Sequence, residues 1–182
     1  NAFNPYVAKS ITALGELMNL GAINETYLVG AVEVPPLQTN IQTHKFAHYP
    51  SSAKVKGTTE IIDMMQGYDF HYDTNIVPFP IQHKRRRECS VYIELFKPEL
   101  NGNPYGSFGI TALEAAGMGK IVVTQNLSNA VYIKYYGDNP LVLCDTVDAF
   151  KKNVAMLDSL GKPDINQLQL STYNWVNDNH SY

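Results

Sequence analysis

The 182-residue sequence contains only two cysteines, Cys89 and Cys144, and each lies in or beside an apolar run. Two such thiols exclude a disulfide framework, and buried free thiols fit a cytoplasmic protein. No apolar stretch approaches the roughly 20 residues that a membrane-spanning helix needs. A basic start followed by an apolar core is missing too, so no secretory signal peptide is predicted. The given sequence starts Asn1-Ala2-Phe3 without a methionine, so we expect it to be a processed or cut product.

The sequence also lacks an excess of charge of either sign. Fourteen basic and 17 acidic residues give a net charge of -3, so no long-range attraction to nucleic acid is expected. The most basic segment is His83-Lys84-Arg85-Arg86-Arg87, which we interpret as a solvated helix face or a patch that covers an adjacent domain. An anionic membrane surface stays open as a weak partner, because five basic residues are few.

Several ligand-binding motifs are missing as well. None of the five histidines has the spacing of a zinc site, so we expect no metal and no bound cofactor. No Gly-x-Gly-x-x-Gly follows the first predicted strand, which argues against a dinucleotide-dependent dehydrogenase. No Gly-Lys-Ser/Thr phosphate loop is present either.

The rhythm of apolar runs predicts an α/β domain with a doubly wound, Rossmann-like parallel sheet. Near-continuous apolar runs such as Ile121-Val122-Val123 are typical of strands that are buried on both faces of a sheet. Helical patterns alternate with them, which indicates right-handed crossovers. The predicted strands are 44–49, 74–79, 90–96, 120–124 and 140–144. The predicted helices are 56–66, 80–88, 108–118, 128–136, 146–160 and 164–178.

The region before residue 36 has a different organisation. Apolar residues recur at helical intervals from Val7 to Leu20, and residues 27–32 have the pattern of a short strand. The segment 34–40 is a stiff linker, because neither Pro35 nor Pro36 can join a helix interior or a sheet ladder. We therefore predict a boundary here, between residues 1–35 and a domain formed by residues 36–182.

The segment from Asn101 to Lys120 contains the first candidate ligand site. Glycines at 102, 106 and 109 allow the backbone to approach a ligand, and Ser107 is suited to cap the following helix. The free amides of Phe108, Gly109 and Ile110, together with the helix dipole, would bind a phosphate group. Glu114 lies one turn deeper on the same face, where its carboxylate could accept hydrogen bonds from sugar hydroxyls. The alternative is a flexible turn before an amphipathic helix with a solvated glutamate.

The second candidate loop follows the predicted strand 44–49. Ser51 and Ser52 supply hydroxyls there, and Lys54 and Lys56 supply ammonium groups. Lysine is a point-charge partner for phosphate, although a solvated basic turn is the alternative. Ligands of parallel sheets bind beyond the carboxyl ends of the strands, so both loops would face one crevice. Phe79, between two prolines, is a hypothetical wall of a base pocket, and His48 is interpreted as a hydrogen-bonded structural histidine.

Two motifs resemble a known family. Lys56-Gly57-Thr58 before Ile61-Ile62 looks like the Lys-Gly turn of retaining glycosyltransferases with the GT-B fold (the glycosyltransferase group 1 family). Gly106-Ser107-Phe108-Gly109, continuing through Glu114 to the strand at 121–123, resembles the signature loop, helix and strand of that family. Their order and separation agree across roughly residues 45–145.

The resemblance implies that residues 36–182 are the domain that binds a nucleotide-diphosphate sugar, for example a UDP- or GDP-sugar. Residues 1–35 would be the end of the acceptor-side domain and the crossover, and the rest of that domain would lie outside this chain. Lys56 and the amides at 108–110 would hold the diphosphate, and Glu114 would bind the ribose. Ser51, Ser52, Lys54, Gly106 and Ser107 would line the same site.

The sequence departs from the family pattern at two positions. Gly106 stands where the family has the glutamate that touches the transferred sugar, and Ser51 stands where it has an arginine. Transfer of a sugar to an unknown acceptor is the expected activity. A non-catalytic nucleotide-sugar or carbohydrate-binding module is the alternative hypothesis.

Overall fold

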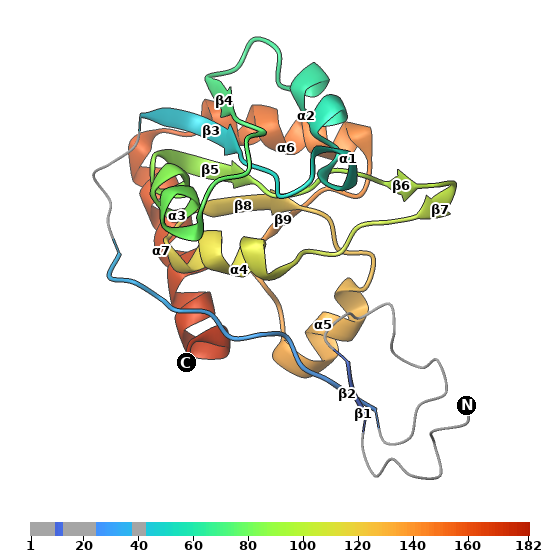
Figure 1. The fold of residues 1–182 in the computed structure, drawn as a ribbon. Helices are drawn as coiled ribbons and strands as arrows, with labels where there is room; N and C mark the ends of the chain where they lie inside the picture. Colours follow the sequence, from blue (N-terminus) through green and yellow to red (C-terminus); the bar gives the residue numbers. More distant parts are fainter. Residues whose placement is uncertain (1–9, 13–24, 38–42) are drawn as a thin grey trace.

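The computed structural model describes residues 10–12, 25–37 and 43–182. Five parallel strands form the main sheet, in the order β4-β3-β5-β8-β9 (Figure 1). Their bounds are β3 His44–His48, β4 Phe70–Tyr72, β5 Cys89–Ile93, β8 Ile121–Thr124 and β9 Val142–Leu143. In the register of the central strands, Phe46 lies opposite Val91 and Tyr92 lies opposite Val122. The predicted α/β class and parallel sheet are therefore confirmed.

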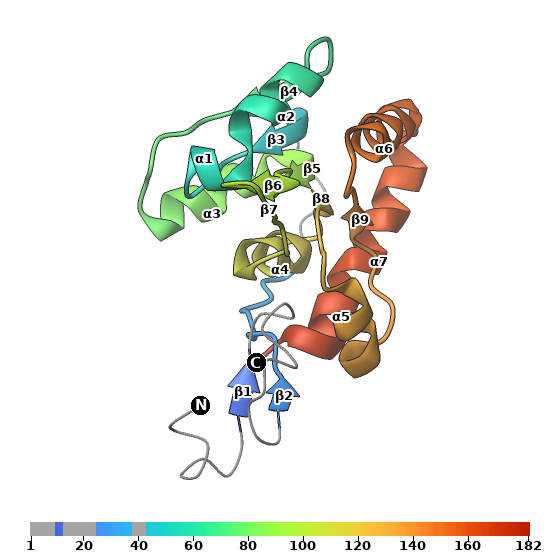
Figure 2. The same cartoon turned by 90° about the vertical axis from the view of Figure 1, so that its right-hand side faces the viewer.

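Helices cover both faces of this sheet, as a doubly wound fold requires (Figure 2). Their bounds are α1 Ala53–Lys56, α2 Thr58–Met64, α3 Phe79–Arg87, α4 Ile110–Gly117, α5 Asn129–Tyr136, α6 Val147–Ser159 and α7 Lys162–His180. One buried cluster joins Val91 and Val123 to α2 and α6. A second cluster joins Tyr92 and Val122, which point to the opposite face, to α4 and α5. Successive strand residues are thus buried on alternate faces, which explains the unbroken apolar runs.

Two predicted elements differ from the structure. Residues 74–79 are not a strand, because the strand that pairs with β3 ends at Tyr72 and the apolar residues Ile76 and Val77 lie in the loop before Pro78. The predicted helix 56–66 is divided into α1 and α2 by Gly57, which adopts a left-handed φ of 69°. In both segments the apolar pattern is overridden by a single residue. Pro78 cannot join a sheet ladder, and Gly57 leaves the helical conformation.

The N-terminal region is only partly described. Of the predicted helix from Val7 to Leu20, the described residues form strand β1 (Ser10–Thr12), which pairs in parallel with β2 (Glu25–Tyr27), so the helical prediction is wrong there. The rest of that helix lies outside the described residues, as do positions 38–40 of the predicted linker.

The segment that follows β2 is attached to the far end of the chain. Val32 forms an isolated bridge with Ser181, and its amide donates a hydrogen bond of 2.8 Å to the carbonyl of His180. The imidazole of His180 is buried and lies 2.6 Å from the Tyr132 hydroxyl. The end of α7 and the segment around Val32 therefore lie side by side (Figure 1). In the part of the chain that the structure describes, no helix has the length and apolarity to cross a bilayer.

Candidate functional site

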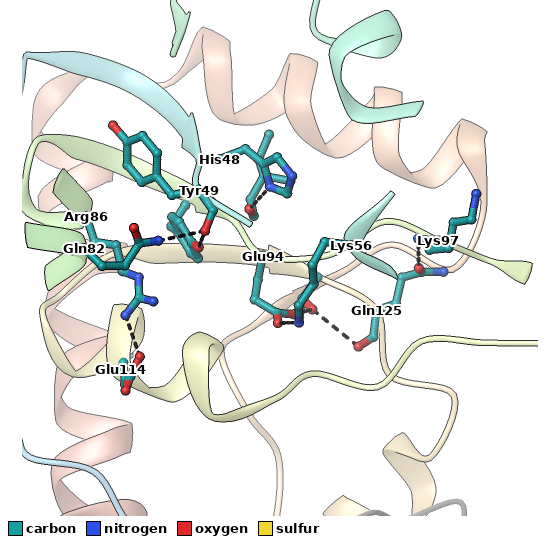
Figure 3. A network of polar contacts seen from close by, with 12 residues as sticks. His48, Tyr49, Lys56, Gln82, Arg86, Glu94, Lys97, Glu114 and Gln125 are labelled. Atoms are coloured by element: carbon teal, nitrogen blue, oxygen red, sulfur yellow. Dashed lines mark hydrogen bonds and ion pairs between the residues drawn. The ribbon is translucent and has the colours of Figure 1, made fainter. Parts of the chain in front are cut away.

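The loops that follow β3, β5 and β8 meet at the carboxyl edge of the sheet. They bring together Lys56 from the first loop, Glu94 from the end of β5 and Gln125 from the end of β8 (Figure 3). A two-stranded antiparallel hairpin, β6 (Glu99–Leu100) and β7 (Asn103–Pro104), projects from the same edge before α4 begins. This edge is where ligands bind in open parallel sheets.

The Lys56-Gly57 turn is attached to the end of β5 through its backbone. The amide of Phe96 donates a hydrogen bond of 3.2 Å to the Lys56 carbonyl. A Cβ atom added to Gly57 would lie only 1.8 Å from the carbonyl oxygen of Phe96, so no other residue fits at this position. The turn therefore positions the Lys56 side chain over the carboxyl end of the central strand.

The Lys56 ammonium forms an ion pair with Glu94 Oε1. The Glu94 side chain is fully buried, and its second oxygen accepts a hydrogen bond of 2.8 Å from the Thr124 hydroxyl. Lys56 keeps 15% of its side chain exposed. The cation that the sequence assigns to a phosphate thus has an internal carboxylate as its partner.

Helix α4 begins two residues later than its predicted cap implies. Gly109, not Ser107, is the residue that precedes the helix. The first hydrogen bond of the turn runs from the Ala112 amide to the Gly109 carbonyl at 3.0 Å, so the amides of Gly109, Ile110 and Thr111 have no acceptor within the helix. A Cβ atom added to Gly109 would lie 3.9 Å from Glu94 Oε1, the oxygen that Lys56 contacts. Gly109, which precedes α4, and the Lys56 ammonium therefore lie next to the same carboxylate.

The side chains around this helix start have separate roles. Phe108 is buried in the core, where its ring packs edge-on against Tyr132 with centroids 5.4 Å apart. Ile110 is 48% exposed, and its Cδ1 would lie 3.3 Å from a Cβ added to Gly30. Only the backbone of these two residues is thus suited to face a ligand at the carboxyl edge.

Gly106 faces the Gln125 side chain. A Cβ atom at position 106, where φ is 120°, would lie 2.9 Å from Gln125 Oε1. That oxygen accepts a hydrogen bond from the Lys97 amide, and Gln125 is fully buried. The carboxylate that the family pattern places at 106 therefore has no room beside Gln125.

Ser51, Ser52 and Lys54 are all exposed on the first loop. Ser52 precedes α1 but makes no side-chain capping bond. Ser51 lines a cavity of about 120 Å³ together with Gln82, Arg86 and Thr111. The first loop therefore contributes to a small cavity between α3 and the first turn of α4, next to the Lys56 region.

Glu114 lies apart from Lys56. Its carboxylate forms an ion pair with Arg86 of α3, with Nη1 and Oε2 2.5 Å apart, and only 19% of its side chain is exposed. Arg86 is buried, and its guanidinium lies over the Tyr92 ring at 5.7 Å. Figure 3 shows Gln82, Arg86 and Glu114 on one side and Lys56, Glu94 and Gln125 on the other. The site residues predicted from the sequence thus form two groups joined by the first turns of α4.

His48 is a hydrogen-bonded structural residue, as the sequence analysis predicts. Its Nδ1 lies 2.8 Å from the Ile93 carbonyl and its Nε2 lies 2.9 Å from the Thr58 hydroxyl. Burial lowers the pKa of His48 to about 4, and the nearby Lys56 charge acts in the same direction. The neutral ring therefore joins the ends of β3 and β5 to the start of α2.

The search of solved structures decides the architecture. TarM, a glycosyltransferase with a GT-B-type fold, superposes with a TM-score of 0.67 at 10% sequence identity. The match covers 98% of this chain and 42% of TarM, so the chain spans less than half of that protein. This chain folds as one Rossmann-like half of a GT-B architecture. The sequence matches no family model and no curated protein.

The other features of this GT-B-type half have structural partners. Within the basic run, Arg86 is buried, whereas Arg85 pairs with Asp73 at 3.3 Å. Phe79 is 58% exposed and opens α3, so it does not lie at the end of a strand. Among the residues that the structure describes, no three histidine, cysteine or acidic side chains gather as metal ligands would. The absence of a metal from the reaction stays a prediction.

Glu94 and Arg86 are not among the site residues that the sequence predicts. Glu94 interrupts the apolar run Val91-Tyr92-Ile93-Glu94-Leu95, and a charge within a buried strand is an informative signal because it needs a partner. No local pattern distinguishes Arg86, which is buried, from the neighbouring basic residues of the same run. Its partner Glu114 is 28 residues away in the sequence.

Proposed function

We propose that this chain binds the nucleotide-diphosphate sugar of a retaining glycosyltransferase, and that a second domain outside the chain holds the acceptor. The convergence of the Lys56 ammonium and the start of α4 on a single carboxylate supports this function. A lysine ammonium next to the start of a helix, at the carboxyl edge of a parallel sheet, is suited to bind an anion. The GT-B-type fold is consistent with this proposed function.

The departing diphosphate would be stabilised by this positive edge. Charge that develops on the leaving oxygen would meet the Lys56 ammonium and the amides at the start of α4. These groups are preoriented, because the Lys56 turn is bonded to Phe96 and α4 is packed into the core. The ribose would lie one helical turn away, near the Glu114 and Arg86 pair, with the base at the small cavity lined by Ser51 and Thr111. We expect this reaction to use neither a metal nor a protein nucleophile, since the lysine and the helix start supply the positive charge.

One observation favours the alternative, a module that binds the nucleotide sugar without transferring it. Gln125 occupies the space beside Gly106, so no carboxylate extends from that position toward a transferred sugar. The positive charge that develops on the sugar would then lack its usual stabilisation. Binding without turnover in the complete protein would support this alternative over the transferase.

Calorimetric titration of the chain tests the proposal directly. UDP, GDP, ADP and their sugars are added in turn, and we expect measurable binding of one nucleotide diphosphate in preference to its nucleoside. No binding of any of them at millimolar concentration would contradict the proposed function. Transfer is then assayed with the bound donor and the complete protein, which distinguishes the enzyme from the binding module.

Two variants test the assignment of the site. Lys56→Gln and Glu114→Gln should each weaken nucleotide binding by about 1–3 kcal/mol, the range of a charge-assisted hydrogen bond. Thermal melting identifies any loss of folding, since both residues form buried ion pairs. Affinities equal to that of the wild type in both folded variants would remove Lys56 and Glu114 from the site.

A further inference from the structure

Glu94 is the most completely enclosed acidic side chain of the carboxyl edge. It follows the last residue of β5, its side chain has no exposed surface, and its backbone amide donates to the Val123 carbonyl at 2.9 Å. Both carboxylate oxygens have partners, the Lys56 ammonium for Oε1 and the Thr124 hydroxyl for Oε2. A buried carboxylate with two such partners is anchored in place.

The anchored carboxylate faces the two groups that would bind a phosphate. Lys56 contacts Oε1, and the residue that precedes α4 faces the same oxygen, since a Cβ added to Gly109 would lie 3.9 Å from it. A negative charge is stabilised near a helix N-terminus. Glu94 thus places a negative charge of the protein itself next to Lys56 and Gly109, where the sequence predicts an external anion.

We propose that Glu94 is an internal anion that holds Lys56 at the start of α4 and sets the affinity of this site for phosphate-bearing ligands. This inference rests on the proposed function, because it concerns the same site. Glu94 itself does not touch the ligand. It determines how much of the Lys56 charge is left for one.

The charge balance gives the direction of the effect. Lys56 cannot leave Glu94 without stranding a buried carboxylate, which is costly, so the pair stays together when a ligand arrives. Lys56 has three N–H donors and its side chain is not completely buried, so donors that Glu94 does not use could bind a phosphate. The negative charge of Glu94 meanwhile repels the diphosphate over a few ångströms in a partly dry environment. The site is therefore preoriented but only weakly attractive, which favours release of the nucleoside diphosphate after transfer.

The test uses inorganic pyrophosphate, because this probe reports on the anion site whichever base the donor carries. Glu94→Gln keeps the shape of the side chain and removes its charge. We expect pyrophosphate to bind this variant about fivefold or more tightly than the wild type, because one nearby repulsive charge is gone. Asp158→Asn is the matched control. It removes one negative charge from the ion pair with Lys45 near the start of β3, and its affinity should equal that of the wild type.

A double variant keeps the proposal testable if a single variant fails to fold. Lys56→Gln/Glu94→Gln replaces the ion pair with a neutral pair, and we expect near wild-type pyrophosphate affinity, whereas Lys56→Gln alone should bind more weakly. An unchanged or lower affinity in folded Glu94→Gln, an equal rise in Asp158→Asn, or a double variant as weak as Lys56→Gln would each overturn the proposal. Failure of all nucleoside diphosphates to bind the wild type, together with the expected pyrophosphate result, would contradict the proposed function but not the role of Glu94.

Discussion

At the scale of single residues, Gly57 has the least room for a side chain among the glycines that the structure describes. Its φ of 69° disfavours any residue with a side chain, and the Phe96 carbonyl oxygen would lie 1.8 Å from a new Cβ. The obstacle is backbone, so it cannot rotate away as a side chain could. The Lys-Gly turn that the sequence predicted therefore needs glycine for packing against β5, as well as for its left-handed conformation.

We expect Gly57→Ala to destabilise the chain by about 3 kcal/mol or more, because backbone strain and a collision act together. Gly102→Ala is the control, since Gly102 has a similar φ of 78° with nothing within 4 Å of its added Cβ. That variant should cost only about 1 kcal/mol. Denaturant unfolding measures both. Equal losses would show that the contact with Phe96 contributes nothing.

His48 makes the stability of the fold depend on pH. Its pKa is lowered from 6.5 to about 4 by burial, so between these values the unfolded state binds a proton that the folded state does not. The contribution of His48 to the free energy of unfolding is fully present above pH 6.5. It is lost as the pH falls toward 4, which lowers the free energy of unfolding by up to about 3 kcal/mol for this residue alone.

Unfolding by urea at a series of pH values checks this expectation. His48→Gln removes the titrating ring, and the slope of the free energy of unfolding between pH 6.5 and 4 should become shallower, even if the variant is less stable at pH 7. A slope identical to that of the wild type would mean that protonation of His48 does not limit stability in acid. Burial also lowers the pKa of His180 to about 4, so the slope should become shallower again when His180 is replaced as well.

At the scale of elements, α3 and α4 are joined by the Arg86 and Glu114 ion pair. Arg86 is buried and Glu114 is largely covered, so neither charge can return to water when its partner is removed. This pair explains why the basic run is not simply a solvated face. One arginine of the run points inward and fixes the distance between the two helices on that side of the sheet.

Removal of one partner should therefore cost more than removal of both. We expect Glu114→Leu to lower the free energy of unfolding by about 3–5 kcal/mol, because it strands the Arg86 guanidinium. Arg86→Met combined with Glu114→Leu should recover a large part of that loss. A double-variant cycle by chemical unfolding measures the coupling. Strictly additive losses would show that the two charges do not act as a pair.

At the scale of the whole molecule, the segment that follows β2 meets the C-terminal end of α7. The Val32 amide donates to the His180 carbonyl, and His180 contacts Tyr132 of α5 within an aromatic group that includes Trp175 and Tyr136. Through these contacts with α7, the segment after β2 packs against the domain. The proposed boundary at residues 35–36 remains a prediction, and these contacts cross it.

Deletion of residues 180–182 should release this segment without unfolding the main sheet. We expect amide hydrogen exchange at Val32 to accelerate by about tenfold or more, while amides of β5 and β8 keep their protection. Deletion of Tyr182 alone is the control, because its side chain is 85% exposed. Unchanged exchange at Val32 in the longer deletion would show that the segment is held by other contacts.

Apolar periodicity and the two glycine-containing motifs were sufficient to predict the parallel α/β sheet, most helices and the loops at the carboxyl edge. These features depend on residues that are close together in the sequence. The local apolar pattern is therefore enough to predict that strands 44–48 and 121–124 are buried. The left-handed glycine at 57 follows from the same local pattern, whereas α4 begins two residues later than that pattern predicts. The predicted strand at 74–79 is wrong, because this segment contains a proline and residues 70–72 pair with β3 instead.

Only the tertiary structure decided which charges face each other. Glu94 and Lys56 are 38 residues apart, and Arg86 and Glu114 are 28 apart, so no local pattern reveals either pair. Burial then changes what these residues can do, because a charge without water depends on the one partner within its reach. The residue types predicted an anion site at one edge of a sheet, and the fold placed an anion of its own there.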